Sequence, residues 1–246
     1  MLPINGFLII DKPSGITSHT AVEDVRRKLK IQKVGHLGTL DPIATGVLVM
    51  AIGRATKLVK YFIDDNKEYR TTMKLGVVTD TQDLDGKILQ ESTSIDVSRE
   101  KVEQVFQQFV GDIEQIPPMV SAKKIGGKRL YKLHRKGIEV ERKPKKIRID
   151  YMNMIEFNLP LVIFEVKCSK GTYVRTICDD IGQKLGTGGA MAGLVRLKSG
   201  FFELSDAVTL KQLEQMDTEQ IMRKIISPML ALKRKNAPAN GLSQSL

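Results

Sequence analysis

The stretch Gly35-His-Leu-Gly-Thr-Leu-Asp-Pro-Ile-Ala-Thr-Gly-Val-Leu48 joins a glycine-rich loop to an apolar run that continues to Ile52. Its three glycines and the Asp41-Pro42 step allow sharp turns, because glycine accepts positive φ and proline fixes φ. The apolar run predicts a buried strand, and a loop on a rigid strand can present one reactive side chain. The only carboxylate of the stretch is Asp41. Taken alone, however, the stretch is more typical of an ordinary turn than of an active site.

The composition indicates a partner that is a polyanion. The chain has 246 residues, of which 41% are hydrophobic, which suits one large domain or two small ones. Lys and Arg number 39 against 28 Asp and Glu, so the net charge is +11, and nucleic acid is the commonest partner of such a protein. No signal peptide or apolar run of membrane-spanning length is present, and two cysteines are too few for a disulfide framework. We therefore expect a soluble, cytoplasmic protein.

Most of the excess charge falls in one segment. Residues 121–148 carry twelve Lys and Arg side chains and only two acids, Glu139 and Glu141. Such a run is either a solvated face or an arm that contacts phosphates, with Gly126-Gly127 and Gly137 as hinges. We favour the arm.

Hydrophobic periodicity and capping residues predict a mixture of strands and helices. The strands are expected at 6–10, 47–52, 67–75, 147–157 and 161–168, with one or two more within 193–204. The helices are expected at 17–30, 55–62, 98–110, 174–185, 209–216 and 217–232. The tail 233–246 is predicted to be disordered.

Several kinds of site are excluded by residue spacing. The acidic run 79–86 resembles a calcium loop only in its middle, because its outer ligand positions would be Thr81 and Ser92, so a hairpin turn around Asp85-Gly86 is preferred. Gly186–Gly189 lacks dinucleotide-binding spacing, and there is no P-loop or nucleophile elbow. The histidines are too far apart in sequence for a zinc site. Chemistry on a polyanion without metal or cofactor is what is left.

Three residues are candidates for such chemistry. A guanidinium such as Arg175 can keep a buried carboxylate such as Asp41 ionised, and an aromatic ring such as Tyr69 can stack on a nucleobase. Each has a plainer interpretation, since Tyr69 and Tyr173 could belong to the core and Arg175 to a helix surface. The residues alone indicate a basic α/β protein that binds nucleic acid, with enzymatic activity left open.

A wider set of motifs carries a family resemblance. The motifs follow one another in family order from about residue 5 to residue 230. They are Gly6-Phe-Leu-Ile-Ile-Asp-Lys-Pro-Ser-Gly-Ile-Thr-Ser-His19, the 35–48 stretch, Gly53-Arg-Ala-Thr-Lys57, Lys67-Glu-Tyr-Arg70, Thr79-Asp-Thr-Gln-Asp-Leu-Asp-Gly86, Pro117-Pro-Met-Val-Ser-Ala122, Gly137-Ile-Glu-Val140 and Cys168-Ser-Lys-Gly-Thr-Tyr-Val-Arg175. With these motifs the chain resembles the TruB family, the tRNA pseudouridine-55 synthases.

The resemblance implies an α+β protein with the pseudouridine-synthase fold, a mixed, mainly antiparallel sheet flanked by helices. Residues 1–232 would form the catalytic domain, with the basic segment 117–148 as an inserted thumb, followed by the low-complexity tail 233–246. The C-terminal RNA-binding module of the PUA type that family members usually carry is expected to be missing.

The resemblance also implies a reaction and roles for individual residues. The enzyme would isomerise a uridine in the T-loop of tRNA, at position 55, by base flipping, as a monomer without cofactor, metal or obligate protein partner. Asp41 would act at the ribose, as nucleophile or as base, Tyr69 would stack on the flipped base, and Arg175 would pair with Asp41. His36 would occupy the space that the base leaves. Weaker assignments near the base are Tyr173, Lys12, Lys57 and Leu197, and the expected RNA-backbone contacts are Lys123, Lys124, Lys128, Arg129 and Lys132.

Two other functions compete with this one. The same cleft could serve a non-enzymatic RNA-binding or RNA-folding protein, and a guide-RNA-dependent synthase would share many motifs. The Asp41, Tyr69 and Arg175 set favours an enzyme, and the expected absence of the C-terminal module, together with the thumb, argues against the guide-dependent class.

Overall fold

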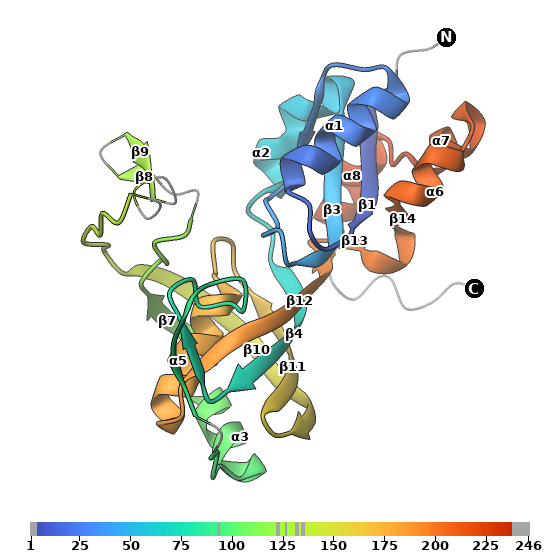
Figure 1. Cartoon of the computed structure of the whole chain (residues 1–246). Helices are drawn as coiled ribbons and strands as arrows, with labels where there is room; N and C mark the ends of the chain where they lie inside the picture. The colour runs from blue at the N-terminus through green and yellow to red at the C-terminus, as the bar shows by residue number, and fades with distance from the viewer. Residues whose placement is uncertain are drawn as a thin grey trace. The chain divides into compact units, whose positions relative to one another are not determined.

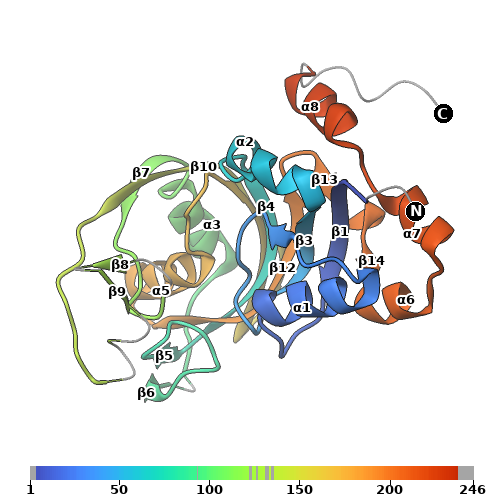
Figure 2. The same cartoon turned by 90° about the horizontal axis from the view of Figure 1, so that it is seen from above.

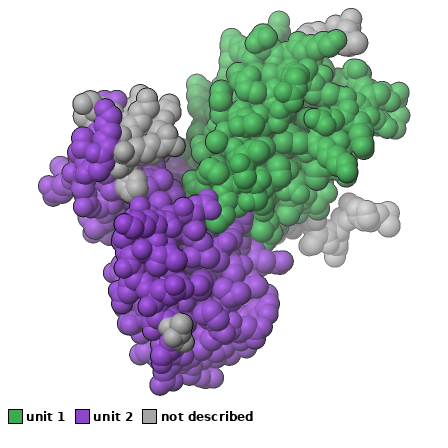
Figure 3. Space-filling view, in the orientation of Figure 1, with its two compact units in different colours: residues 1–67, 195–246 green, residues 68–194 purple. Residues whose placement is uncertain are grey.

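The computed structural model describes residues 4–92, 94–121, 124–125, 127–130, 133 and 136–237. The chain divides into two compact units, which Figure 3 distinguishes by colour. Unit 1 comprises residues 1–67 and 195–246, and unit 2 comprises residues 68–194. The chain passes between the units within two strands, β4 (Lys67–Leu75) and β12 (Gly189–Ser199). Unit 1 is therefore built from two segments that are distant in sequence, and unit 2 is the continuous segment between them.

Unit 1 is organised on a strand pair. β1 (Gly6–Lys12) and β3 (Thr45–Ile52) are antiparallel over their whole length, in the register Gly6 to Ile52. β2 (Val34–His36) is antiparallel to β3, and the end of β12 is parallel to it. The short strands β14 (Val208–Thr209) and β13 (Phe202–Glu203) extend the sheet beside β1 and β12. The predicted strands 6–10 and 47–52 are confirmed.

Helices cover both faces of the unit 1 strands (Figure 2). On one face lies α1 (Ser18–Leu29), whose first turn is capped by the Thr17 hydroxyl, with α6 (Leu210–Gln215) beside it. On the other face lie α2 (Val59–Phe62), which continues the 3-10 turn η1 (Gly53–Leu58), and α8 (Pro228–Asn236). η2 (Leu204–Asp206) and α7 (Thr218–Lys224) complete the unit.

Three phenylalanines centre the core on the second face. The ring of Phe7 lies 5.1 Å from that of Phe62 and 5.6 Å from that of Phe202. Val47 and Val49 complete this apolar layer, and all five side chains are buried. Burying an aromatic or branched side chain contributes about 1.5–3 kcal/mol, so this cluster holds β3 rigidly behind the loop that precedes it.

Unit 2 contains a second strand array, in the order β12, β4, β11 (Leu161–Cys168), β10 (Lys145–Asn158) and β7 (Gly111–Gln115). β10 is antiparallel to both β11 and β7. The helices α3 (Arg99–Gln107) and α5 (Val174–Leu185) contact each other, and α3 lies against β10, as Figure 1 shows. Two hairpins lie apart, β5 (Val77–Thr79) with β6 (Ile88–Glu91), and β8 (Lys124–Ile125) with β9 (Lys128–Arg129).

This architecture confirms the α+β class and the mixed, mainly antiparallel strand pairing. The hairpin expected around Asp85-Gly86 is also confirmed, because β5 and β6 pair across it. Most strand and helix predictions hold to within a few residues, including 67–75, 161–168 and 174–185.

Four predicted elements need correction. The helix expected at 98–110 ends at Gln107, and Gly111, with φ of 107°, opens strand β7 instead. The first half of the helix expected at 55–62 belongs to the 3-10 turn η1, and only Val59–Phe62 is α-helical. The strand expected from Gly193 begins at Gly189. These differences arise because tertiary pairing overrides local propensity.

The fourth correction concerns the C-terminal helices. The helix expected at 217–232 is two, α7 and α8, because the backbone of Ile226 pairs with Phe7, with both N–H to O distances 2.9 Å. Pro228 then starts α8 without needing an N–H partner. The first four residues of the predicted disordered tail are helical, since α8 continues to Asn236, while residues 238–246 lie outside the described part of the chain.

Candidate active site

The loop that carries Asp41 is fixed on both sides of this residue. The Ser18 hydroxyl accepts a hydrogen bond from the Leu40 N–H at 2.8 Å and donates one to the Leu40 carbonyl at 3.0 Å. On the other side, the Gly15 N–H donates to the Pro42 carbonyl at 2.9 Å. Asp41 itself is half-buried. The loop is therefore a rigid mount that leaves its carboxylate partly accessible.

A buried guanidinium closes the base of this loop. Arg196, on β12, is 2% exposed and bonds three backbone carbonyls. Its Nε donates to Val47 at 2.6 Å, its Nη2 to Gly38 at 3.1 Å and its Nη1 to Thr39 at 3.3 Å. One planar side chain thus ties the start of the loop to the strand that follows it. Arg196 is not among the predicted site residues, although a charged residue between the apolar Val195 and Leu197 is a usable signal.

Gly46 allows β12 to approach this point. Its φ is 94°, and a Cβ at this position would collide with the carbonyl oxygen of Arg196. Because that neighbour is backbone, no side-chain rotation could relieve the overlap. Gly46 therefore allows both the positive φ of the turn and the close approach of the Arg196 backbone.

Lys12 is a second buried cation beside the loop. Its Nζ donates to the carbonyls of Pro13 at 2.8 Å, Ile16 at 2.9 Å and Pro42 at 3.2 Å. Burial lowers the pKa of Lys12 to about 8, although the nearby Asp41 carboxylate opposes this shift; Arg196 adds a smaller lowering effect. The structure thus brings Lys12 to the Asp41 loop, where its ammonium holds the backbone.

His36 lies at the end of β2, where the loop begins. Its Nδ1 accepts a hydrogen bond from the Gly38 N–H at 3.3 Å. Burial lowers the pKa of His36, and the positive charge of Arg196 lowers it further. The ring is therefore neutral at pH 7, with its proton on Nε2. The remaining unit 1 candidates are exposed Lys57, on η1, and half-buried Leu197, on β12.

In unit 2, Arg175 is buried on the first turn of α5. Its Nη1 lies 3.2 Å from Oδ2 of Asp83, and its Nη2 donates to the Val120 carbonyl at 2.6 Å. The guanidinium carbon lies 6.0 Å from the centre of the Tyr173 ring. Arg175 is 4% exposed, so the interpretation of it as a surface residue is wrong. Asp83 is a partner that sequence analysis did not identify.

The acidic hairpin is anchored to α5 by a polar network. The Thr81 hydroxyl donates to Oδ1 of Asp83 at 2.6 Å. The neighbouring Gln82 accepts from the Thr176 hydroxyl at 2.6 Å and donates to Asp179 at 2.8 Å. The acidic run 79–86 therefore has a structural role: it anchors the Arg175 side chain and the helix α5 that bears it.

Tyr69 lies on β4 with one side partly accessible. It shares a strand face with Thr71 and Met73, which are both buried, whereas Tyr69 is only half-buried. The Thr71 hydroxyl donates to the Gly193 carbonyl at 2.9 Å, which fixes β4 on β12 near this point. The ring thus has the partial exposure that a stacking platform requires.

Of the expected RNA-backbone residues, Lys123 and Lys132 lie outside the described residues. Lys124, Lys128 and Arg129 lie on the β8–β9 hairpin. Within the basic segment, Met119, Leu130 and Leu133 form a small apolar cluster with Val140 packed against it. This cluster gives the segment a core of its own.

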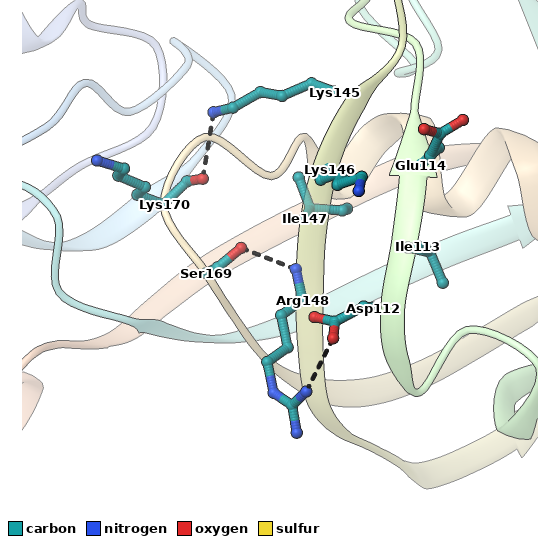
Figure 4. Close-up of a pocket in the computed structure, with 9 residues that line it drawn as sticks. All are labelled: Asp112, Ile113, Glu114, Lys145, Lys146, Ile147, Arg148, Ser169 and Lys170. Atoms are coloured by element: carbon teal, nitrogen blue, oxygen red, sulfur yellow. Dashed lines mark hydrogen bonds and ion pairs between the residues drawn. The ribbon is translucent and has the colours of Figure 1, made fainter.

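A groove of about 530 Å³ lies where the basic segment returns to the sheet (Figure 4). Arg148 Nη1 lies 3.3 Å from Asp112, and Lys145 Nζ donates to the Lys170 carbonyl at 3.4 Å. Lys146 is directly opposite Glu114 across the β10–β7 pair. The full lining is Asp112, Ile113, Glu114, Lys145, Lys146, Ile147, Arg148, Ser169 and Lys170.

Two family models match the chain. The model of the TruB family pseudouridylate synthase N-terminal domain covers residues 26–174, and that of the tRNA pseudouridylate synthase B C-terminal domain covers residues 175–232. The chain belongs to the TruB family. The resemblance drawn from the sequence motifs is therefore confirmed.

Curated relatives from the TruB family are similar over nearly the whole chain. The tRNA pseudouridine synthase B of Syntrophotalea carbinolica is 47% identical over 94% of this chain and 75% of its own length. That of Clostridium tetani is 46% identical over 94% of this chain and 79% of its own length.

Solved structures agree on the fold. A Cbf5-Nop10-Gar1 complex contains a chain that is 29% identical, with a TM-score of 0.72 over 93% of this chain and 62% of that one. A structure of an H/ACA RNP bound to a substrate RNA containing 2'-deoxyuridine gives 28% identity and a TM-score of 0.67 over 93% of this chain and 61% of that one. This chain thus spans about three fifths of those two chains, and the predicted pseudouridine-synthase fold is confirmed.

The remaining reactive groups of this TruB family chain are buried or scattered. Cys168 and Cys178 are buried free thiols, and burial raises the pKa of Cys178 to about 12. Within the described part of the chain, no three His, Cys, Asp or Glu side chains are arranged to hold a metal ion. Among the described helices, none is long and apolar enough to cross a membrane.

Proposed function

We propose that this chain isomerises uridine to pseudouridine in the T-loop of tRNA, at position 55. Its membership of the TruB family and its 46–47% identity to proteins named tRNA pseudouridine synthase B support this function. The observation that carries it is the Asp41 loop, which bears a single, half-buried acid and whose backbone is bonded by two buried cations, Lys12 and Arg196. A reaction that needs one accurately placed carboxylate suits this loop.

Asp41 acts at the ribose of the target uridine. The reaction breaks the N-glycosidic bond and forms a C–C bond to the same uracil, so the detached base must be retained and water excluded. Asp41 serves either as a nucleophile on C1′ or as a base in a glycal route. A hydrolase with two carboxylates would need a second acid in the loop. The Gly35–Leu48 stretch contains none.

The other predicted site residues position the flipped base. The Tyr69 ring stacks on uracil and takes part in the final deprotonation, and the neutral His36 ring fills the space that the base leaves. Extruding a base costs a few kcal/mol, and stacking on an aromatic ring returns about 1–3 kcal/mol. Tyr173, Lys12, Lys57 and Leu197 form the walls near the base.

Arg175 pairs with Asp41 in the proposed complex. A guanidinium carries five N–H donors, so it can serve Asp83, the Val120 carbonyl and a further carboxylate together. In that complex, the positive charge of Arg175 would favour the ionised form of Asp41, which either chemical route requires.

The basic segment 117–148 is the proposed thumb that grips the T-stem. Its cations neutralise phosphates, and phosphate contacts supply most of the non-specific affinity of a protein for RNA. Five lysines and arginines on it are the proposed contacts: Lys123, Lys124, Lys128, Arg129 and Lys132. The groove of Figure 4 adds exposed Lys146 and Lys170 at the root of the segment.

We assign catalysis to residues 1–232 and propose a cytoplasmic monomer that acts on tRNA without an obligate protein partner, cofactor or metal. The guide-RNA-dependent alternative draws support from the similarity to a chain of an H/ACA RNP bound to a substrate RNA. The relatives with the higher identity, 46–47%, are named tRNA pseudouridine synthases, which favours tRNA as the direct substrate.

Release of tritium from [5-³H]uridine in T-arm RNA tests this function. The wild-type chain should release tritium in the absence of any guide RNA or metal, and Asp41→Asn should reduce the rate by at least about 10³-fold, since the carboxylate takes part in bond breaking. A wild type that binds RNA but releases no tritium would leave the non-enzymatic RNA-binding function. An Asn variant as active as the wild type would remove Asp41 from the mechanism.

A further inference from the structure

The turn formed by residues 169–175, which bears Tyr173 and Arg175, is held from both ends of the basic segment. Gln115, at the end of β7, precedes the segment and bonds Tyr173. Val120, near its start, accepts a hydrogen bond from Arg175 at 2.6 Å. Lys145, at the start of β10, donates to the Lys170 carbonyl at 3.4 Å. All of these groups belong to unit 2.

The contact of Gln115 with Tyr173 has two points. The Gln115 Nε2 donates to the Tyr173 carbonyl at 3.0 Å, and its Oε1 accepts from the Tyr173 N–H at 2.8 Å. The amide therefore pairs with both backbone groups of one residue, as a neighbouring strand would do. Two bonds fix the orientation of the Tyr173 backbone as well as its position.

Tyr173 also precedes the first turn of α5. It is the N-cap residue of that helix, and its own side chain makes no capping hydrogen bond. The Gln115 side chain is 3% exposed and so is held in one place by its surroundings. The start of α5, with Arg175 two residues later, thus takes its position from a side chain at the root of the basic segment.

The opposite end of the segment touches the same turn. Gly171 has φ of 72°, and a Cβ there would collide with the Lys145 Nζ. The ammonium therefore lies directly on the backbone of the turn. Both roots of the segment, on β7 and β10, are paired with each other in antiparallel register from Gln115–Lys145 to Gly111–Ile149.

We propose that Gln115 is a positioning residue for pseudouridine formation. It fixes the positions of Tyr173 and Arg175 relative to the end of β7, where the basic segment begins. This inference rests on the proposed function. Gln115 acts through the backbone of Tyr173 and touches no substrate. A displacement of about 1 Å in a reacting group can cost 10²-fold in rate, so a loss of this contact is expected to slow the chemical step.

The variant Gln115→Met tests this role, because methionine fills a similar volume and can make neither hydrogen bond. Gln108→Met is the matched control, since Gln108 is exposed in the same unit and the one described hydrogen bond of its side chain is with Lys184. The rate of tritium release in a single turnover at saturating T-arm RNA, the dissociation constant for that RNA and the folded fraction by circular dichroism are measured together.

Gln115→Met should release tritium at least about tenfold more slowly per folded molecule, with an RNA dissociation constant within about threefold of the wild-type value. Gln108→Met should match the wild type. A purely structural role would reduce only the folded fraction. A rate per folded molecule within twofold of the wild type, or a loss confined to RNA affinity, overturns the proposal.

Gln115→Glu gives a second, independent measurement. An ionised glutamate keeps the bond from the Tyr173 N–H but has no proton to donate to the Tyr173 carbonyl, whereas a protonated glutamate can make both bonds. Relative to the wild type at the same pH, the rate of this variant should therefore fall as the pH rises and the carboxyl group ionises. This comparison decides the question if the Met variant does not fold; a rate equal to that of the wild type at every pH overturns the proposal. A wild type that releases no tritium would instead contradict the proposed function, and the positioning role with it.

Discussion

The Nζ of Lys12 lies 3.2 Å from the carbonyl oxygen of Pro42, the residue that follows Asp41. The same ammonium bonds the carbonyls of Pro13 and Ile16, so all three of its protons have acceptors. This side chain is fully buried, and burial lowers its pKa to about 8. The loop of the proposed catalytic carboxylate thus depends on a cation that titrates close to neutral pH.

We predict that the rate of pseudouridine formation decreases as the pH rises through about 8. A neutral amine keeps two N–H donors, so it releases one of the three carbonyls and loses its attraction for Asp41. Single-turnover tritium release from about pH 6 to pH 10 measures this decrease in rate. Lys12→Met should be slower at all pH values, and its rate should not decrease through pH 8. A wild-type profile that is flat through pH 9 would contradict the prediction.

The same pKa makes the free energy of unfolding depend on pH. The pKa of Lys12 falls from 10.5 in the unfolded chain to about 8 in the folded one, so the unfolded chain binds more protons between these values. The contribution of Lys12 to the free energy of unfolding is therefore fully present above pH 10.5. It decreases as the pH falls from 10.5 through 8, with a slope of at most about 1.4 kcal/mol per pH unit. In urea unfolding, the wild type should gain stability relative to Lys12→Met between pH 8 and pH 10. An unchanged difference would show that Lys12 does not titrate there.

Arg196→Met should destabilise the protein by about 1–3 kcal/mol and slow the reaction. The substitution leaves the buried Val47 carbonyl without its donor, which costs about 1–3 kcal/mol, and it also removes the donors to the more accessible carbonyls of Gly38 and Thr39. Urea unfolding and tritium release measure the two effects. Lys198→Met, on the same strand, removes a surface ion pair with Glu203 and should cost under about 1 kcal/mol. Equal effects of the two substitutions would contradict a special role for Arg196.

The sequence predicts correctly those helices and strands whose own residues determine their structure. The helix expected from Thr17 begins with the Thr17 hydroxyl accepting from the Thr20 N–H at 3.0 Å, and its apolar face is Ala21, Val22 and Val25. The strand 47–52 is apolar throughout because both of its faces are covered by helices. In each case, the residues that form the element also carry its signal.

The contacts that the sequence did not predict join distant residues. β7 is a polar run that becomes a strand only because it pairs with β10, and Asp83 and Arg175 are 92 positions apart. Asp41 could be singled out from its loop and from the family motifs. The residues that fix that loop, above all Arg196, became recognisable only when β12 was placed beside Val47.

Asp83→Asn should reduce the free energy of unfolding by about 3 kcal/mol or more, because it leaves the buried Arg175 charge without its carboxylate. The two side chains are 6% and 5% exposed, and their closest atoms are 3.2 Å apart. The displaced guanidinium should also slow tritium release. Asp85→Asn is the control, since Asp85 is exposed two residues further along the hairpin, and it should change stability by under about 0.5 kcal/mol. Similar stabilities for both variants would show that the Asp83–Arg175 pair is dispensable.

The double variant Lys143→Ala/Lys146→Ala should bind T-arm RNA more weakly and with a lower salt dependence. Both lysines are exposed where the basic segment ends, Lys143 just before β10 and Lys146 on it. Each lost phosphate contact reduces the slope of log K against log salt concentration by about 0.7–0.9, so the slope should fall by about 1–2. Filter binding from low to moderate salt measures it, with Lys87→Ala/Lys101→Ala as the control, because these lysines are exposed elsewhere in unit 2. If both double variants lower the slope equally, the affinity comes from net charge rather than from this segment, and the assignment of the segment as the RNA grip fails.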